Sequence, residues 1–242
     1  MLDIARAARD GLDIYRDRLS VLIKLVLPVL IARQLLAAFY SSLVTGLSPS
    51  WLFTGIGVAV GESAAAIAIY IGISVCLADA PVKPGSLNWS PGTLFVVWLT
   101  TVCLSIAISL PVLLYGLLTV HLGIFASLGF PLLFWVVMGL SLVVMGLSLF
   151  YPIYIVKYDQ GPIESVASSV RAAKDSWLRV SAMVAVLWAV WCGAEWAAYA
   201  VTGGVDAGVT LLGTVVAVVT SAVYMYLYAI TVSAWVQLDN AR

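Results

Sequence analysis

Six long apolar runs, separated by short polar breaks, dominate the sequence. A helix that crosses about 30 Å of hydrocarbon needs about 20 mostly apolar residues, since each residue adds 1.5 Å. The runs all meet that length, and the breaks between them carry turn-forming glycine and proline. The sequence therefore predicts six spanning helices, at approximately Leu19–Thr45, Leu52–Leu77, Leu94–Val120, Phe130–Val156, Val180–Val201 and Gly208–Val236.

The boundary between the third and fourth runs is the least defined. No charged residue lies between Leu94 and Val156, where the helix breakers are Pro111 and Pro131. We interpret this stretch as two long spans, with two spans flanking a re-entrant piece as the alternative.

Two further segments have a helical period but are too polar to span. Residues 1–18 and 162–179 each place one apolar stripe on an otherwise charged helix. Proline suits the first position of a helix, so Pro162 is expected to begin the second one, whose stripe includes Trp177. Each helix is expected to lie in the cytoplasmic interface, to dock on the floor of the bundle, or to bind a soluble partner. The second stripe consists of Ile163, Val166, Val170, Ala173, Trp177 and Val180.

The predicted fold class is therefore an all-α integral membrane protein. Residues 1–242 form one membrane domain with six transmembrane helices and two interfacial amphipathic helices. Its parts are an interfacial helix at 1–18, spans one to four at 19–156, an interfacial helix at 162–179, and spans five and six at 180–238.

The basic residues predict the orientation of the chain. Ten of the twelve lysines and arginines lie before the first span, after the last, or in the connections that follow spans two and four. Short loops rich in lysine and arginine stay in the cytoplasm, so both termini are expected there, in a cell membrane. The ten are Arg6, Arg9, Arg16, Arg18, Lys83, Lys157, Arg171, Lys174, Arg179 and Arg242.

The composition and net charge of the chain argue against a soluble domain and against nucleic-acid binding. The chain is 63% hydrophobic and only 10% charged, so it lacks the polar surface of a soluble domain. Its net charge of zero argues against a nucleic-acid partner, because phosphate binding needs a basic excess. The expected partners are membrane lipids, other membrane subunits or a second copy of the chain.

Three charged residues lie deep within predicted spans, where a charge costs about 2.5–3.5 kcal/mol. Arg33 and Glu62 fall at similar depths in neighbouring spans, and Glu195 lies at a comparable level in span five. A pair between Arg33 and Glu62 would fix the packing of two helices. The functional alternative is an intramembrane polar cluster that binds a solute, an ion or a lipid headgroup.

Span two also carries small residues at every fourth position. Gly57, Gly61 and Ala65 predict a helix-packing face that allows close approach of another span, with a subunit interface as the alternative.

The residues that catalysis requires are missing from the sequence. His121 is the only histidine, so neither a histidine-pair metal site nor a conventional serine nucleophile has its partner. No glycine-rich phosphate loop is present, and no cofactor is expected. The sequence therefore favours a protein that is not an enzyme.

One segment resembles a known family. The stretch FYPIYIVKYDQGPIESVASSVRAAKDSWLRV has an aromatic residue and proline at the end of a span, then Gly-Pro and a helix with alanine, serine and tryptophan. It resembles prokaryotic multi-span membrane domains of poorly known function, including YciC-like proteins and the membrane domain of some glycerophosphodiester phosphodiesterases. The catalytic phosphodiesterase domain is not expected in this chain. The matching positions are Tyr151, Pro152, Gly161, Pro162, Ala167, Ser168, Ser169, Lys174 and Trp177.

Two classes of function follow from these observations. The first is a non-catalytic structural or accessory subunit of a membrane assembly, or a membrane-organising protein. The second is a small transporter or lipid-handling protein that uses the Arg33, Glu62 and Glu195 site. Corresponding breaks in two halves of the chain, typical of transporters, are not evident, which favours the first class.

Overall fold

The computed structural model describes residues 2–33, 51–78, 90–122, 129–202 and 211–240, and these are helical without strands. The predicted all-α class is therefore confirmed for this part of the chain. The elements are α1 (Ile4–Leu25), α3 (Trp51–Leu77), α4 (Pro91–Leu122), α5 (Gly129–Ser148), α6 (Tyr151–Tyr158), α7 (Pro162–Ala173), the 3₁₀ turn η1 (Lys174–Ser176), α8 (Trp177–Thr202) and α9 (Leu211–Asp239).

Four of the described segments are long and apolar enough to cross a membrane. They correspond to the second, third, fourth and sixth predicted runs. Residues 34–45 of the first run lie outside the described residues, as do most side chains in the second half of α8. Six spans thus remain a prediction, while four candidate spans are present at Val60–Leu77, Pro91–Leu110, Trp135–Tyr158 and Val218–Asp239.

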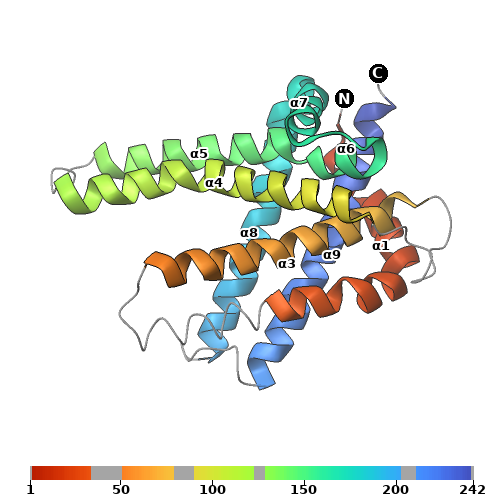
Figure 1. Cartoon of the computed structure of the whole chain (residues 1–242), viewed down its shortest axis with the longest axis horizontal. Coiled ribbons are helices and arrows are strands. Elements are labelled where there is room, and N and C mark those ends of the chain that lie inside the picture. The colour runs from red at the N-terminus through yellow and green to blue at the C-terminus, as the bar shows by residue number, and fades with distance from the viewer. Residues whose placement is uncertain (1, 34–50, 79–89, 123–128, 203–210, 241–242) are drawn as a thin grey trace.

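The long helices cross one another in two directions. Figure 1 shows α4 and α5 side by side, with α3 next to α4, while α8 and α9 cross them steeply. Helix α1 packs along α9, and the two ends of the chain lie at the same end of the molecule as α7. There the Asp3 N–H donates to Gln237 Oε1 at 3.2 Å, and Arg179 Nη1 donates to the Leu2 carbonyl at 2.8 Å.

A proline determines where α1 ends. The boundary predicted between residues 18 and 19 is not a break, because α1 continues to Leu25. A turn follows at Val26, and residues 27–33 are helical again. Pro28 has no N–H to donate, and its ring crowds the carbonyl of Lys24 one turn earlier, which explains an interruption at this point.

A second proline divides the predicted fourth span. Instead of one helix over Phe130–Val156, α5 ends at Ser148 and α6 begins at Tyr151, with Pro152 in its first turn. The Ser169 hydroxyl of α7 accepts the Phe150 N–H at 3.0 Å and donates to the Leu147 carbonyl at 2.7 Å. A side chain from α7 therefore satisfies two backbone groups that the break releases.

Helix α7 buries its small residues and exposes its large ones. It begins at Pro162 as predicted, after Gly161 as N-cap. Along the predicted stripe, Ile163 is 87% exposed and Trp177 42% exposed, whereas Ala173 and Val180 are buried. The face that packs on the α5–α6 break instead consists of Ser165, Ser168, Ser169, Ala172 and Ala173.

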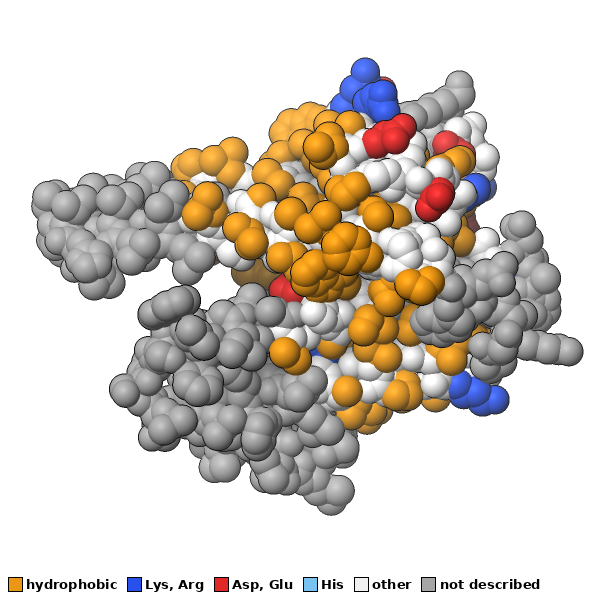
Figure 2. Space-filling view, in the orientation of Figure 1, with side chains coloured by type: hydrophobic (Ala, Val, Ile, Leu, Met, Phe, Trp, Pro, Cys, Tyr) orange, Lys and Arg blue, Asp and Glu red, His pale blue; other side chains and the backbone are white. Residues whose placement is uncertain are grey.

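Apolar side chains also cover much of the outer surface. In Figure 2 hydrophobic residues spread across the region where α4 and α5 lie, and the charged ones lie mainly toward α7, the chain ends and α1. Phe95, Ile106, Trp135 and Leu140 are each more than half exposed on α4 and α5. Such a surface suits a lipid environment, because water would penalise so large an apolar patch.

Candidate functional site: a buried polar cluster

Arg33 lies at the end of the helical residues that follow Pro28 and points toward α9. Its Nη1 lies 3.5 Å from the Tyr224 hydroxyl, and its guanidinium carbon lies 5.7 Å from the centre of that tyrosine ring. A cation over an aromatic face is attracted by the ring quadrupole by about 0.5–2 kcal/mol. Tyr224 thus provides both a hydroxyl and a ring to a partly buried charge.

Glu62 connects α3 to α4. Its Oε2 accepts a hydrogen bond from Ser105 Oγ at 2.9 Å. The next residue, Ser63, accepts a hydrogen bond from Trp98 Nε1, also at 2.9 Å. Trp98 and Ser105 lie about two helical turns apart on α4, so the two bonds fix how α3 and α4 are rotated against each other.

Tyrosines lie within electrostatic range of both charges. Tyr151 of α6 shares a 2.7 Å hydrogen bond with Thr101 of α4, and both are buried. Glu62 lies within electrostatic range of Arg33 and of Tyr151, and Tyr228 lies within that range of Arg33. In the described residues Arg33 and Glu62 form no direct ion pair, because each charge is held by hydroxyls of a neighbouring helix.

The tyrosines were not predicted from the sequence. Tyr224 and Tyr228 lie four residues apart in the last apolar run, which places both hydroxyls on one face of the helix. A pair of hydroxyls on one face of a spanning segment was the signal available for them.

The other predicted site residues lie elsewhere. The side chain of Glu195 and the surroundings of Gly57 are outside what the structure describes, so the predicted third charge and packing face stay predictions. A Cβ added to Gly61 would meet no described atom within 4 Å. The close approach of α3 to another helix instead occurs at Gly72, against the ring of Tyr228.

The cluster offers hydroxyls, one carboxylate and one guanidinium. Such groups can hold helices together or bind a polar solute, and among the described residues no three metal-ligating side chains gather. No protein family model, no characterised protein and no solved structure matches this chain. Its function is therefore inferred from these residues.

Proposed function

We propose that this protein is a non-catalytic polytopic membrane protein that acts as a structural or accessory subunit of a membrane assembly, or as a membrane organiser. It crosses the cell membrane six times, with both termini in the cytoplasm. The distribution of basic residues supports this topology. The contacts of Asp3 with Gln237 and of Arg179 with Leu2 also support it, because an even number of spans returns the chain to its starting side.

The observation that carries the proposal is the burial pattern of α7. Its serine and alanine face packs on the α5–α6 break, so its apolar residues point outward. Ile163, Val170 and Trp177 are exposed on a segment that also carries Glu164, Arg171 and Lys174. An exposed apolar side bordered by charges is typical of a helix in the headgroup region. This favours a protein that attaches to the cytoplasmic leaflet along its surface.

Spin labels on α7 test this placement in reconstituted vesicles. In a background with Cys76, Cys103 and Cys192 replaced by alanine, a label at Ile163→Cys is expected to collide mainly with oxygen, which concentrates in lipid. A label at the adjacent Glu164→Cys is expected to collide mainly with a water-soluble nickel complex. Equal access of the nickel complex to both positions would remove the interfacial placement of α7.

The contacts of the deep charges support a structural role for them. Arg33 is held by α9 through Tyr224, and Glu62 is held by α4 through Ser105. The first interaction joins the two ends of the chain, and the second joins two consecutive helices. A transporter built on Arg33, Glu62 and Glu195 would instead require water to reach these groups.

Chemical labelling distinguishes the two functions. In the same cysteine-free background, Ser105→Cys is expected to resist a charged, water-soluble thiol reagent, because its side chain lies beside Glu62 within the bundle. Gly92→Cys, at the exposed start of α4 where an added Cβ has room, is the control and is expected to react fully. Reaction of Ser105→Cys at a comparable rate would favour the transporter and count against the accessory role.

A further inference from the structure

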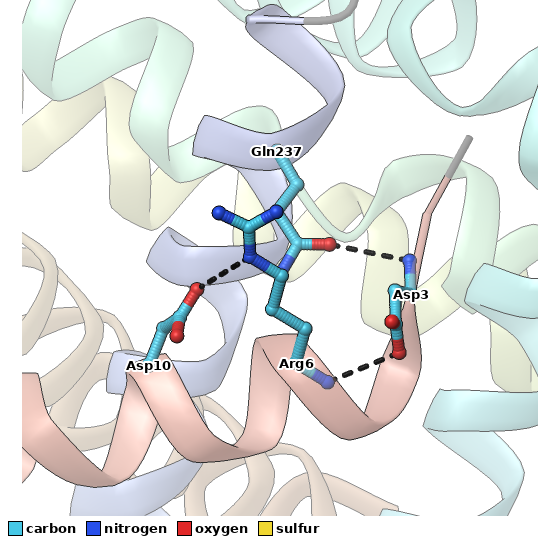
Figure 3. A network of polar contacts seen from close by, with 4 residues as sticks. All are labelled: Asp3, Arg6, Asp10 and Gln237. Atoms are coloured by element: carbon cyan, nitrogen blue, oxygen red, sulfur yellow. Dashed lines mark hydrogen bonds and ion pairs between the residues drawn. The ribbon is translucent and has the colours of Figure 1, made fainter.

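A polar cleft of about 430 Å³ lies between the first half of α1 and the end of α9. Arg6 and Asp10 of α1 line it together with Asp3, the N-cap of that helix, and opposite them lie Gln237 of α9 and Asn240, the residue after α9. Figure 3 shows the side chains of Asp3, Arg6 and Asp10 beside Gln237. Ile14 and Val236 add an apolar wall, so the cleft has both polar and apolar lining.

The end of α9 determines the depth of this cleft in the membrane. The apolar segment Val218–Asp239 has 22 residues, which at 1.5 Å each extend about 33 Å and match a bilayer core of about 30 Å. In the membrane placement proposed above, Gln237 and Asn240 lie where the hydrocarbon gives way to headgroups. The cleft opens at that level.

One residue that lines the cleft carries a donor without an acceptor. The Asp3 N–H fixes the orientation of the Gln237 amide by donating to its Oε1. Within the described part of the chain, the buried Gln237 Nε2 has no hydrogen-bond partner. A buried donor left in this way favours binding of an acceptor oxygen at the same place.

The charges of the cleft define the chemistry of a ligand. Two carboxylates and one guanidinium give a net charge of about −1 at neutral pH. Arg6 Nε and Asp10 Oδ2 are 3.5 Å apart, with side chains 68% and 48% exposed, so both can reorient toward a ligand. A purely anionic group would meet net repulsion, whereas a group with a phosphate and an ammonium matches Arg6 and Asp10 together.

The lining also distinguishes between kinds of ammonium. Quaternary ammonium groups are recognised by aromatic rings, and none of the described residues that line the cleft is aromatic. A primary ammonium donates hydrogen bonds that the Asp10 carboxylate can accept.

We propose that this cleft binds the phosphoethanolamine headgroup of a membrane phospholipid. The phosphate oxygens accept hydrogen bonds from Arg6 and, once a shift of the Gln237 side chain uncovers its Nε2, from that amide. The ammonium donates to Asp10, and Ile14 and Val236 contact the first methylenes. This assignment rests on the membrane placement proposed above, because it requires the end of α9 at headgroup depth.

Native mass spectrometry of the full chain tests the assignment. In an equimolar mixture of dioleoyl phosphatidylethanolamine, phosphatidylcholine and phosphatidylglycerol, the ethanolamine lipid is expected to be retained about tenfold over the other two, or about 1.4 kcal/mol. Asp10→Asn and Gln237→Glu are expected to abolish this preference. The Gln237→Glu variant keeps an acceptor for the Asp3 N–H while removing the donor. Asp13→Asn, an exposed α1 position outside the cleft, is the matched control and is expected to keep the preference.

Three results would overturn the headgroup site: no preference in the unmodified protein, equal loss in Asp13→Asn, or full displacement by equimolar glycerophosphoethanolamine. The last result would identify a soluble ligand in place of a lipid. The spin labels on α7 separate this failure from failure of the proposed function. If the spin label at Ile163 lies in lipid but the mass spectra show no headgroup preference, only the cleft assignment is wrong. If the label at Ile163 is exposed to water, the interfacial placement of α7 is wrong.

Discussion

Replacement of Ser169 by alanine is expected to lower the stability of the protein by about 2–4 kcal/mol. The hydroxyl accepts the Phe150 N–H and donates to the Leu147 carbonyl, and both Ser169 and Phe150 are fully buried. Each buried polar group left without a partner costs about 1–3 kcal/mol. At roughly 2–4 °C per kcal/mol for a chain of this size, the unfolding midpoint should fall by roughly 5–15 °C.

Thermal unfolding in detergent, followed by tryptophan fluorescence, measures this change. Ser165→Ala is the matched control, because Ser165 is equally buried on the same helix but its hydroxyl donates only to the nearby Pro162 carbonyl at 2.9 Å. We expect Ser165→Ala to lose less than about 1 kcal/mol, the usual net value of one hydrogen bond. Equal losses of stability in the two variants would show that the Ser169 hydrogen bonds across the α5–α6 break contribute no more than an ordinary local hydrogen bond.

Gly11→Val should be the second strongly destabilising change. A Cβ at Gly11 would lie 2.9 Å from the Ile230 Cα of α9, which is backbone and cannot rotate away. The larger side chain forces α1 from α9 and weakens the 2.9 Å bond from the Tyr226 hydroxyl to the Ala8 carbonyl. Overpacking of this kind costs about 1–3 kcal/mol, so the midpoint should fall by roughly 3–10 °C.

The control for this change is Gly61→Ala. No described atom lies within 4 Å of the Cβ that it adds, and alanine is preferred over glycine in helices by about 1 kcal/mol. Its unfolding midpoint should therefore stay the same or rise. A loss as large as that of Gly11→Val would instead place a helix contact at the predicted Gly57, Gly61 and Ala65 face.

The apolar runs predicted where helices form better than where they are interrupted. Pro28 and Pro152 lie inside runs that are long enough to span, so run length alone indicated continuous helices. The interruptions depend on groups distant in sequence. The break before Pro152 is compensated by Ser169 of α7, and no local pattern links those two positions.

The faces of the helices were harder to predict than their positions. A spanning helix is apolar all around, so its sequence does not specify which side meets which neighbour. Glycine spacing suggested a contact at Gly61, whereas the close approaches in the described residues are at Gly11, Gly72 and Gly146. For α7, the serines that pack inward resemble an exposed polar face, and only tertiary hydrogen bonds distinguish the two.

The half-buried charges illustrate the same limit. Depth along a helix could be counted from the sequence, and Arg33 and Glu62 lie within electrostatic range of each other without forming a direct ion pair in the described residues. Their actual partners, Tyr224 and Ser105, depend on the rotation of α9 and α4 about their axes. That rotation is set by packing between helices.

The contact between α1 and α9 has a consequence for how the protein is made. Ala8 and Tyr226 are 218 residues apart, and Asp3 and Gln237 are 234 apart. At about 5–20 residues per second, a ribosome needs roughly 10–45 s to synthesise the partner that α1 requires. During that interval the apolar side of α1 lacks its final contact, and the membrane surface is the nearest place that can cover it. The first helix is thus synthesised long before α9, the helix against which it packs.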